Sequence, residues 1–350
     1  MKPVRAGVTV LDLASSITVD LIPASGIETR SIDWIWEGWL ARGKTHLLAG
    51  DAGTGKTTLA MKMAATVSAG GEWPDGSVAP TGNVLVWSGE DDPEDTLVPR
   101  LHAAGADLDR IFVVGETRRG HTARAFDPST DMELLIARAA EIGDVSLVVI
   151  DPVIALITGD GHKSTDVRRG LQPLVELASL LRCAVVGISH FSKSGGAGTD
   201  PLLRVTGSVA FGAVVRVVMV AAKKRGEDHR VLARAKSNIG PDDGGWSYKI
   251  DVVESPLPAS VAVWGEALTG DAADLIEGRC PGERVLDQAQ DWLEQILTAG
   301  PVVTTDVKAA AEAAGYSWRS LERAKATLGV RSRKDGPDGA WRWSLPGDGV

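Results

Sequence analysis

The sequence contains little cysteine, little tyrosine and phenylalanine, no excess of positive charge and no long apolar run. Only two cysteines, Cys183 and Cys280, occur among 350 residues, and they form no CxxC pair. This scarcity argues against a disulfide scaffold and a cysteine-rich zinc site, and it favours a reducing compartment.

The absence of long apolar runs bears on location and partners. No run reaches the roughly 18 to 20 residues of a membrane span, and Met1 to Asp20 contains no continuous apolar segment of the kind found in signal peptides. We therefore expect a cytoplasmic protein that has no membrane partner. The net charge of −9 provides no global attraction for nucleic acid, so any such contact must use local basic clusters.

A glycine-rich segment is the most informative feature that is present. Residues 50–57 read Gly-Asp-Ala-Gly-Thr-Gly-Lys-Thr and match the pattern GxxxxGK[ST] of a phosphate-binding P-loop. An apolar run at 44–49 precedes it and an Ala-, Met- and Leu-rich run at 56–68 follows it, which predicts a buried strand, a loop and a helix. The backbone N–H groups of such a loop and the positive end of its helix bind phosphate. The alternative is an ordinary glycine turn.

The P-loop predicts a site for ATP and Mg²⁺. We expect Lys56 to reach the terminal phosphates as a point charge and Thr57 to ligate Mg²⁺. The residues expected to contact the nucleotide at this loop are Gly50, Asp51, Ala52, Gly53, Thr54, Gly55, Lys56, Thr57 and Thr58.

A carboxylate follows each of two further apolar runs. The run at 145–150 ends at Asp151, a Walker B pattern that would hold Mg²⁺ through water at the carboxyl edge of a sheet; the alternative is a simple turn at Asp151-Pro152. The run at 83–88 leads to Glu90, which could polarise the water that attacks the γ-phosphate. The alternative for Glu90 is helix capping, although Asp92 suffices for the cap.

A histidine follows another apolar run. Residues 184–189 lead to His190, which we expect at the same edge of the sheet. A polar residue there could sense the γ-phosphate, and the alternative is a structural histidine.

The order of the expected elements predicts an α/β fold with a RecA-like core, in which a parallel sheet carries an antiparallel extension. We expect strands at 44–49, 83–88, 111–114, 145–150, 183–189, 214–222, 229–235, 246–253 and 260–265. We expect helices at 56–68, 93–105, 131–142 and 166–182. The first five strands should be parallel and the last four antiparallel. The domains that we expect are a lead-in segment at 1–40 whose tryptophans pack on the core or on a neighbouring subunit, an ATPase domain at 41–267, a linker at 268–282 and a small module at 283–350.

The small module is predicted to be a winged helix, with three helices followed by two strands around a turn at 335–339. Thr304 or Thr305 should cap its second helix and Ser317 its third. Its basic residues are Arg319, Arg323, Lys325, Arg331, Arg333, Lys334 and Arg342. The module could place a helix in the major groove of DNA, or it could dock a replication or repair protein, and the two interpretations stay open.

These motifs together resemble the RecA-like hexameric ATPases of the RepA plasmid replicative-helicase type, which are related to the DnaB helicases. The resemblance covers residues 35–255 and includes Ser189-His190-Phe191-Ser192-Lys193. It implies that Glu90 is the catalytic carboxylate and His190 a γ-phosphate sensor. It also implies that Arg216, eight residues after Thr206-Gly207-Ser208, is a finger that enters the neighbouring subunit's site. Lys236 and Asn238 match a nucleotide-binding segment near the same subunit interface. The alternative for Arg216 is an edge-strand arginine that pairs with a carboxylate.

The resemblance further implies a ring, most simply a hexamer, with single-stranded DNA in its channel. Two loops, 158–169 and 192–206, correspond to channel loops, and their cations would track a DNA backbone. These cations are Lys163, Arg168, Arg169, Lys193 and Arg204. The alternative is that both are ordinary solvent-exposed loops.

The function expected from the sequence is an ATP-driven DNA helicase or translocase of replication or repair. One alternative is an ATPase that acts as a non-unwinding switch or loader. Another is a DNA-binding regulator that uses the C-terminal module.

Overall fold

The computed structural model describes residues 21–161, 163–191, 201–205, 209–223, 228–254, 257–277, 283–334 and 339–346. The chain divides into two units, residues 1–32 and residues 33–350. The described part of the first unit holds one short 3₁₀ turn, Ala24–Gly26, none of whose residues is buried. The segments of the sequence analysis that lie outside the described residues are 1–20, residue 162, 192–200 with Lys193, Thr206-Gly207-Ser208, 278–282, 335–338, 347–350 and the side chain of Arg319.

A large mixed sheet forms the centre of the second unit. Among the described residues it has nine strands in the order β13-β12-β11-β10-β3-β9-β8-β4-β5. The parallel strands are β3 (Lys44–Gly50), β4 (Asn83–Ser88), β5 (Ile111–Val113), β8 (Val145–Asp151), β9 (Ala184–Ile188) and β10 (Val217–Lys223). The antiparallel strands are β11 (Arg230–Ser237), β12 (Gly245–Val253) and β13 (Ala259–Leu268).

Strand β10 differs from its prediction. It was expected to be the first antiparallel strand, but it pairs in parallel with β3, with Val217 opposite His46 and Ala221 opposite Gly50. The physical reason is a crossover between β9 and β10 that includes the short helices α5 (Pro201–Arg204) and α6 (Val209–Val214). A crossover carries the chain back to the end of the sheet where the preceding strand began, so the next strand runs parallel to it.

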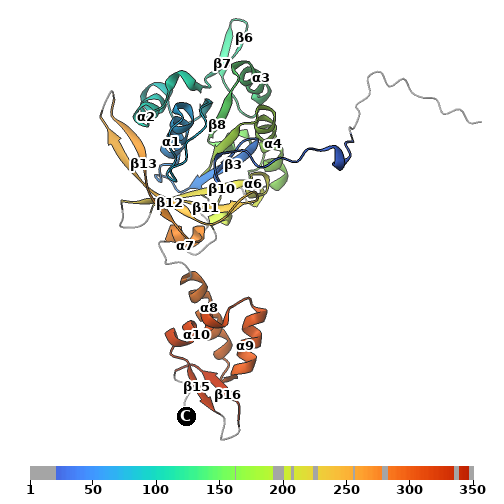
Figure 1. Ribbon diagram of the computed structural model, residues 1–350, viewed down its shortest axis with the longest axis vertical. Helices are drawn as coiled ribbons and strands as arrows, with labels where there is room; N and C mark the ends of the chain where they lie inside the picture. Colours follow the sequence, from blue (N-terminus) through green and yellow to red (C-terminus); the bar gives the residue numbers. More distant parts are fainter. Residues whose placement is uncertain are drawn as a thin grey trace, which may run out of the picture. The chain divides into compact units, whose positions relative to one another are not determined.

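Helices cover both faces of the parallel part of the sheet (Figure 1). Helices α1 (Lys56–Ala69) and α2 (Val98–Ala103) pack on one face. Helices α3 (Met132–Ile142), α4 (Ser164–Leu181) and α6 pack on the other. Adjacent strand residues such as Leu47 and Leu48 enter opposite cores, which explains why these strands are apolar without interruption.

Two tryptophans of the lead-in segment, Trp36 and Trp39, are part of the core. Strands β1 (Trp34–Trp36) and β2 (Leu40–Ala41) form a small hairpin. Trp36 stacks on Trp39 and Trp73 with ring centroids 4.8 and 4.7 Å apart. Trp73 Nε1 also donates to the carbonyl of Ile35 at 2.9 Å. Of the two expected positions for these tryptophans, the structure shows the one on the core of the same chain.

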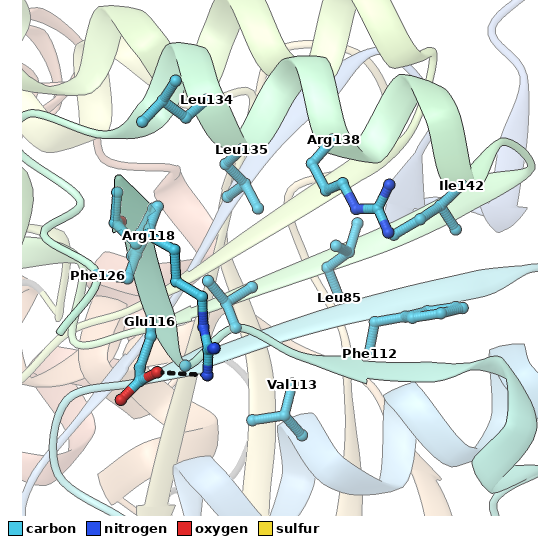
Figure 2. A pocket seen from close by; sticks show the side chains of 13 residues that line it. Leu85, Phe112, Val113, Glu116, Arg118, Phe126, Leu134, Leu135, Arg138 and Ile142 are labelled. Carbon is cyan, nitrogen blue, oxygen red and sulfur yellow. Dashed lines mark hydrogen bonds and ion pairs between the residues drawn. The ribbon is translucent and has the colours of Figure 1, made fainter. Parts of the chain in front are cut away.

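A hairpin that was not predicted follows β5. Its strands are β6 (Glu116–Arg119) and β7 (Thr122–Ala125). The buried Asp131 accepts hydrogen bonds from both terminal nitrogens of Arg124 at 2.6 Å and from Thr117 at 2.7 Å. An apolar cavity of about 540 Å³ lies among this hairpin, β5 and α3. Figure 2 shows the side chains that line it, including the ion pair between Glu116 and Arg118.

In its described residues, the C-terminal module contains three helices and a three-stranded sheet in the order β14-β16-β15. Its elements are α8 (Glu283–Leu297), β14 (Val302–Val303), α9 (Thr304–Ala313), α10 (Trp318–Thr327), β15 (Arg331–Lys334) and β16 (Trp341–Ser344). Ser317 caps α10 as predicted, since its hydroxyl accepts the N–H of Ser320 at 3.1 Å. The predicted cap of α9 is wrong: the helix begins at Thr304 and Val303 occupies the cap position, because β14 runs directly into the helix.

Among the described residues, no helix combines the length and the apolar character that crossing a membrane requires.

Candidate nucleotide-binding site

The glycine-rich loop joins β3 to α1 and is held in place by contacts with neighbouring strands. Gly50 has φ +154°, and a Cβ there would lie 2.1 Å from the carbonyl oxygen of Ala221 on the neighbouring strand. The Thr54 hydroxyl donates to the carbonyl of Asp51 at 2.9 Å. From the antiparallel extension, the buried hydroxyl of Tyr248 donates to the carbonyl of Thr54 at 2.7 Å. The loop is therefore supported by β10 at Gly50 and by β12 at Thr54.

Lys56 occupies the centre of the loop. Its Nζ donates to the carbonyls of Gly50 and Asp51 at 3.1 and 3.0 Å and lies 3.3 Å from Nδ1 of His190. Burial lowers the pKa of Lys56, whereas the charges of Asp151, Asp51 and Glu90 oppose this effect. A buried ammonium group held by carbonyl oxygens is placed to exchange them for phosphate oxygens.

Thr57 and Asp151 meet at the adjoining end of β8. The Thr57 hydroxyl donates to Oδ2 of Asp151 at 2.7 Å. Burial raises the pKa of Asp151 to about 6, the hydrogen bond from Thr57 acts against this, and the charges of Glu90 and Asp91 add to it. A hydroxyl and a carboxylate side by side are the oxygen ligands that Mg²⁺ takes in nucleotide sites, so this donor set fits the metal.

Glu90 lies just beyond the end of β4, on the same edge. The hydroxyl of Ser88 accepts the N–H groups of Glu90 and Asp91 at 3.3 and 2.9 Å. The cap of the following helical turn is Asp92, whose carboxylate accepts the N–H groups of Glu94 and Asp95. Capping therefore does not account for Glu90.

His190 follows β9 and completes the group. Burial lowers the pKa of its imidazole, and the nearby charge of Lys56 lowers it further, while Glu90 acts in the opposite direction. A cavity of about 250 Å³ brings this side chain together with those of the preceding paragraphs. The residues that line the cavity are Ala52, Gly53, Gly55, Lys56, Thr57, Thr58, Glu90, Asp91, Arg100, Asp151, Ile188 and His190.

Three expected site residues lie where the parallel strands begin, at the edge of the sheet opposite the one that carries the P-loop. Arg216 directly precedes β10, and its N–H donates to the carbonyl of Thr45 at the start of β3. Asn238 follows β11 and donates its N–H to the carbonyl of Arg216. Lys236 donates to the carbonyl of Gly212, and burial and the charge of Arg216 lower its pKa. Within one chain these residues do not meet the P-loop, so Lys236 and Asn238 cannot contact the nucleotide that their own chain binds.

The basic residues expected to contact DNA divide into two groups. Lys163, Arg168 and Arg169 lie at the start of α4 with exposed side chains, and Arg169 pairs with Asp166 at 3.3 Å. The expectation for Arg204 needs correction. Its side chain is only 19% exposed and pairs with Asp51 of the P-loop at 3.1 Å.

The inward position of Arg204 has a structural cause. Phe191 and Val205 form a β-bridge that brings the chain back to the end of β9. The guanidinium carbon of Arg204 then lies 4.3 Å from the centroid of the Phe191 ring. Arg204 is thereby held against the P-loop and does not face solvent as a channel residue would.

Family comparisons agree with this geometry. Residues 15–196, just over half of the chain, match the AAA domain family. The chain belongs to the AAA domain family. It is also similar to the DNA repair protein RadA of Brucella abortus (strain 2308), with 27% identity over 229 residues, which are 63% of this chain and 41% of that protein. The chain thus spans about two fifths of the length of this relative. Together with the parallel sheet and the P-loop, these matches identify a RecA-like P-loop ATPase core.

Sequence patterns did not reveal the roles of three residues that the structure places around the nucleotide cavity or its loop. Tyr248 holds the P-loop from β12, Arg100 reaches the cavity from α2, and Arg204 pairs with the loop from α5. Each lies far along the chain from its partner or inside a helix of ordinary composition. No local signal could have shown them, because each role depends on which strands and helices become neighbours.

Proposed function

We propose that the protein is an ATP-hydrolysing, ring-forming DNA helicase or translocase that serves replication or repair. The observation that carries the proposal is the convergence of Lys56, Thr57, Asp151, Glu90 and His190 on one cavity. The resemblance to hexameric helicases of the RepA type and the similarity to a DNA repair protein favour DNA as the partner.

Each converging residue has a chemical task in this proposal. Lys56 binds the terminal phosphates of ATP, while Thr57 and Asp151 would hold Mg²⁺, which neutralises charge on the transferred phosphoryl group. Glu90 accepts a proton from the attacking water. His190, close to both Lys56 and the strand end, detects the γ-phosphate and passes this information to the chain that follows it.

A ring of subunits would bring Arg216 of one chain to the nucleotide site of its neighbour. Arg216 lies at the sheet edge away from its own P-loop, so it can complete only a neighbour's site. As a finger, its guanidinium would stabilise the charge that develops during phosphoryl transfer. Lys236 and Asn238 lie beside it and would contact the same neighbouring nucleotide. A closed ring, most simply a hexamer, would provide every subunit with such a neighbour.

Mixed rings test this arrangement. We expect Arg216→Ala and Lys56→Ala proteins to be inactive alone. Mixed before assembly, they should regain ATPase activity, because at random placement about a quarter of the interfaces would pair an intact Lys56 with an intact Arg216. Steady-state ATPase assays across mixing ratios measure the effect. Mixtures that stay inactive at all ratios, although native mass measurements show mixed assemblies, would exclude Arg216 as a finger.

ATPase and strand-displacement assays test the proposed action on DNA. ATPase activity should rise several-fold with single-stranded DNA, and the protein should displace a strand from a forked duplex. The double variant Lys163→Glu, Arg168→Glu should lose the stimulation and keep the DNA-free rate, because both side chains are exposed on the segment after Asp151. The control is Arg138→Glu, which changes an exposed arginine on α3. Unstimulated ATPase activity in the unmodified protein would disprove the DNA-driven motor.

The C-terminal module supports a second candidate function. Its order of helix, strand, two helices and two strands is compatible with the predicted winged helix, and Arg331 and Arg333 are exposed on β15. In this alternative the ATPase is a non-unwinding switch, loader or regulator, and the module docks a replication or repair protein or duplex DNA. Nucleotide-dependent assembly without strand displacement would favour it.

A further inference from the structure

The main chain around Glu90 is tied down on both sides. The N–H of Gly89 donates to the carbonyl of Asp151 at 2.8 Å. The Ser88 hydroxyl accepts the N–H groups of Glu90 and Asp91. Among the described residues, no hydrogen bond or ion pair holds the Glu90 carboxylate itself. The position of this carboxylate therefore depends on the turn that carries it.

Asp91 and Arg100 close that turn. Nη1 of Arg100 lies 2.6 Å from Oδ2 of Asp91, and the two side chains are only 24% and 27% exposed. Arg100 stands on α2 between Pro99 and Leu101, which are both buried in the core. The ion pair thus links the residue after Glu90 to a helix that is anchored on the sheet.

The pair also shapes the charge of the cavity. Glu90, Asp91 and Asp151 contribute three carboxylates to the same cavity that must admit a polyphosphate. Arg100 lines this cavity and offsets one of these charges.

We propose that Arg100 is a positioning residue for ATP hydrolysis, and that its ion pair with Asp91 fixes the turn from which Glu90 reaches the attacking water. This proposal rests on the proposed role of Glu90. Arg100 acts through Asp91 and not on the nucleotide. A partly exposed ion pair contributes little to global stability, whereas a small displacement of a catalytic group reduces turnover strongly.

Kinetics separate positioning from a structural role. Arg100→Gln should reduce the DNA-independent kcat by about tenfold to a hundredfold, with the Kd of a fluorescent ATP analogue changed less than about threefold. The urea midpoint should stay close to that of the unmodified protein. Arg100→Lys should recover part of the rate, because it keeps the charge but not the planar geometry. The control is Arg110→Gln, which breaks exposed ion pairs with Asp107 and Asp144 outside the cavity and should leave kcat unchanged.

A double-mutant cycle identifies the partner. Asp91→Asn should match Arg100→Gln, and the double variant should be no slower than either single variant. Additive losses, an unchanged kcat, or a loss confined to nucleotide affinity would overturn the proposal.

The Glu90→Gln variant separates this proposal from the proposed function. Adding Arg100→Gln to it should lower kcat no further. Normal hydrolysis by Glu90→Gln would remove the catalytic role of Glu90 itself. If the Glu90→Gln protein is inactive while the Arg100→Gln protein hydrolyses ATP at the normal rate, the catalytic role of Glu90 stands. That result would refute only the positioning role of Arg100.

Discussion

Replacing Glu90 with glutamine should stop ATP hydrolysis while ATP binding continues. Glutamine has the same shape but cannot accept the proton of the attacking water, and loss of such a group costs about 10²- to 10⁴-fold in rate. Binding should persist because Lys56, Thr57 and the loop amides are unchanged. Stability should persist because Asp92, not Glu90, caps the adjoining helical turn.

Steady-state ATPase assays, titration with a fluorescent ATP analogue and thermal unfolding measure these three quantities. Glu94→Gln is the matched control, since it neutralises an exposed carboxylate in the same acidic segment outside the cavity. An unfolded Glu90→Gln protein would assign the residue a structural role. An equal loss of ATPase activity in the Glu94→Gln control would show that hydrolysis depends on the total charge of the segment and not on the Glu90 carboxylate.

Replacing Asp151 with asparagine should abolish Mg²⁺-dependent hydrolysis and make the nucleotide-free protein more stable at neutral pH. The pKa of Asp151 is raised to about 6 from 3.8, chiefly by burial. Between these two values the folded state binds more protons than the unfolded state, so this group's contribution to stability falls as pH rises through the window. Asparagine keeps an acceptor for the Thr57 hydroxyl without the buried charge, and we expect a gain of about 1–2 kcal/mol at pH 7.5.

Urea unfolding at pH 5 and pH 7.5, without Mg²⁺ or nucleotide, measures the difference. The gain in the variant should shrink at pH 5, where Asp151 is largely protonated. Asp131→Asn is the opposing control. The Arg124 guanidinium and other hydrogen-bond donors hold the pKa of Asp131 well below its usual range, so its neutralisation should destabilise the protein at pH 7.5. A destabilised Asp151→Asn protein would show that the buried charge is compensated in the folded state.

Local patterns predicted the strands that lead to the nucleotide site. The apolar runs before Asp151 and His190 and the run leading to Glu90 became parallel strands β8, β9 and β4. Because parallel strands end at one edge, their terminal residues were expected together, and the structure places all three in one cavity. The catalytic roles of these residues stay predictions until the variants above are measured.

Longer-range features escaped prediction for a different reason. The direction of β10 depends on two short helices in a stretch of ordinary composition, and this direction places Arg216 at the edge away from the P-loop. Arg204 looked like an exposed loop cation but turned onto Asp51, because its orientation follows from the bridge between Phe191 and Val205.

Local sequence was enough to predict the P-loop, the buried strands and the polar residues that end them, because these depend on neighbours a few positions away along the chain. Long-range packing was needed to show which edge of the sheet Arg216 occupies, that Tyr248 supports the loop, and that Arg100 holds Asp91 beside Glu90. Those facts depend on strand order and crossover direction, which arise from packing across the whole core and leave no local pattern.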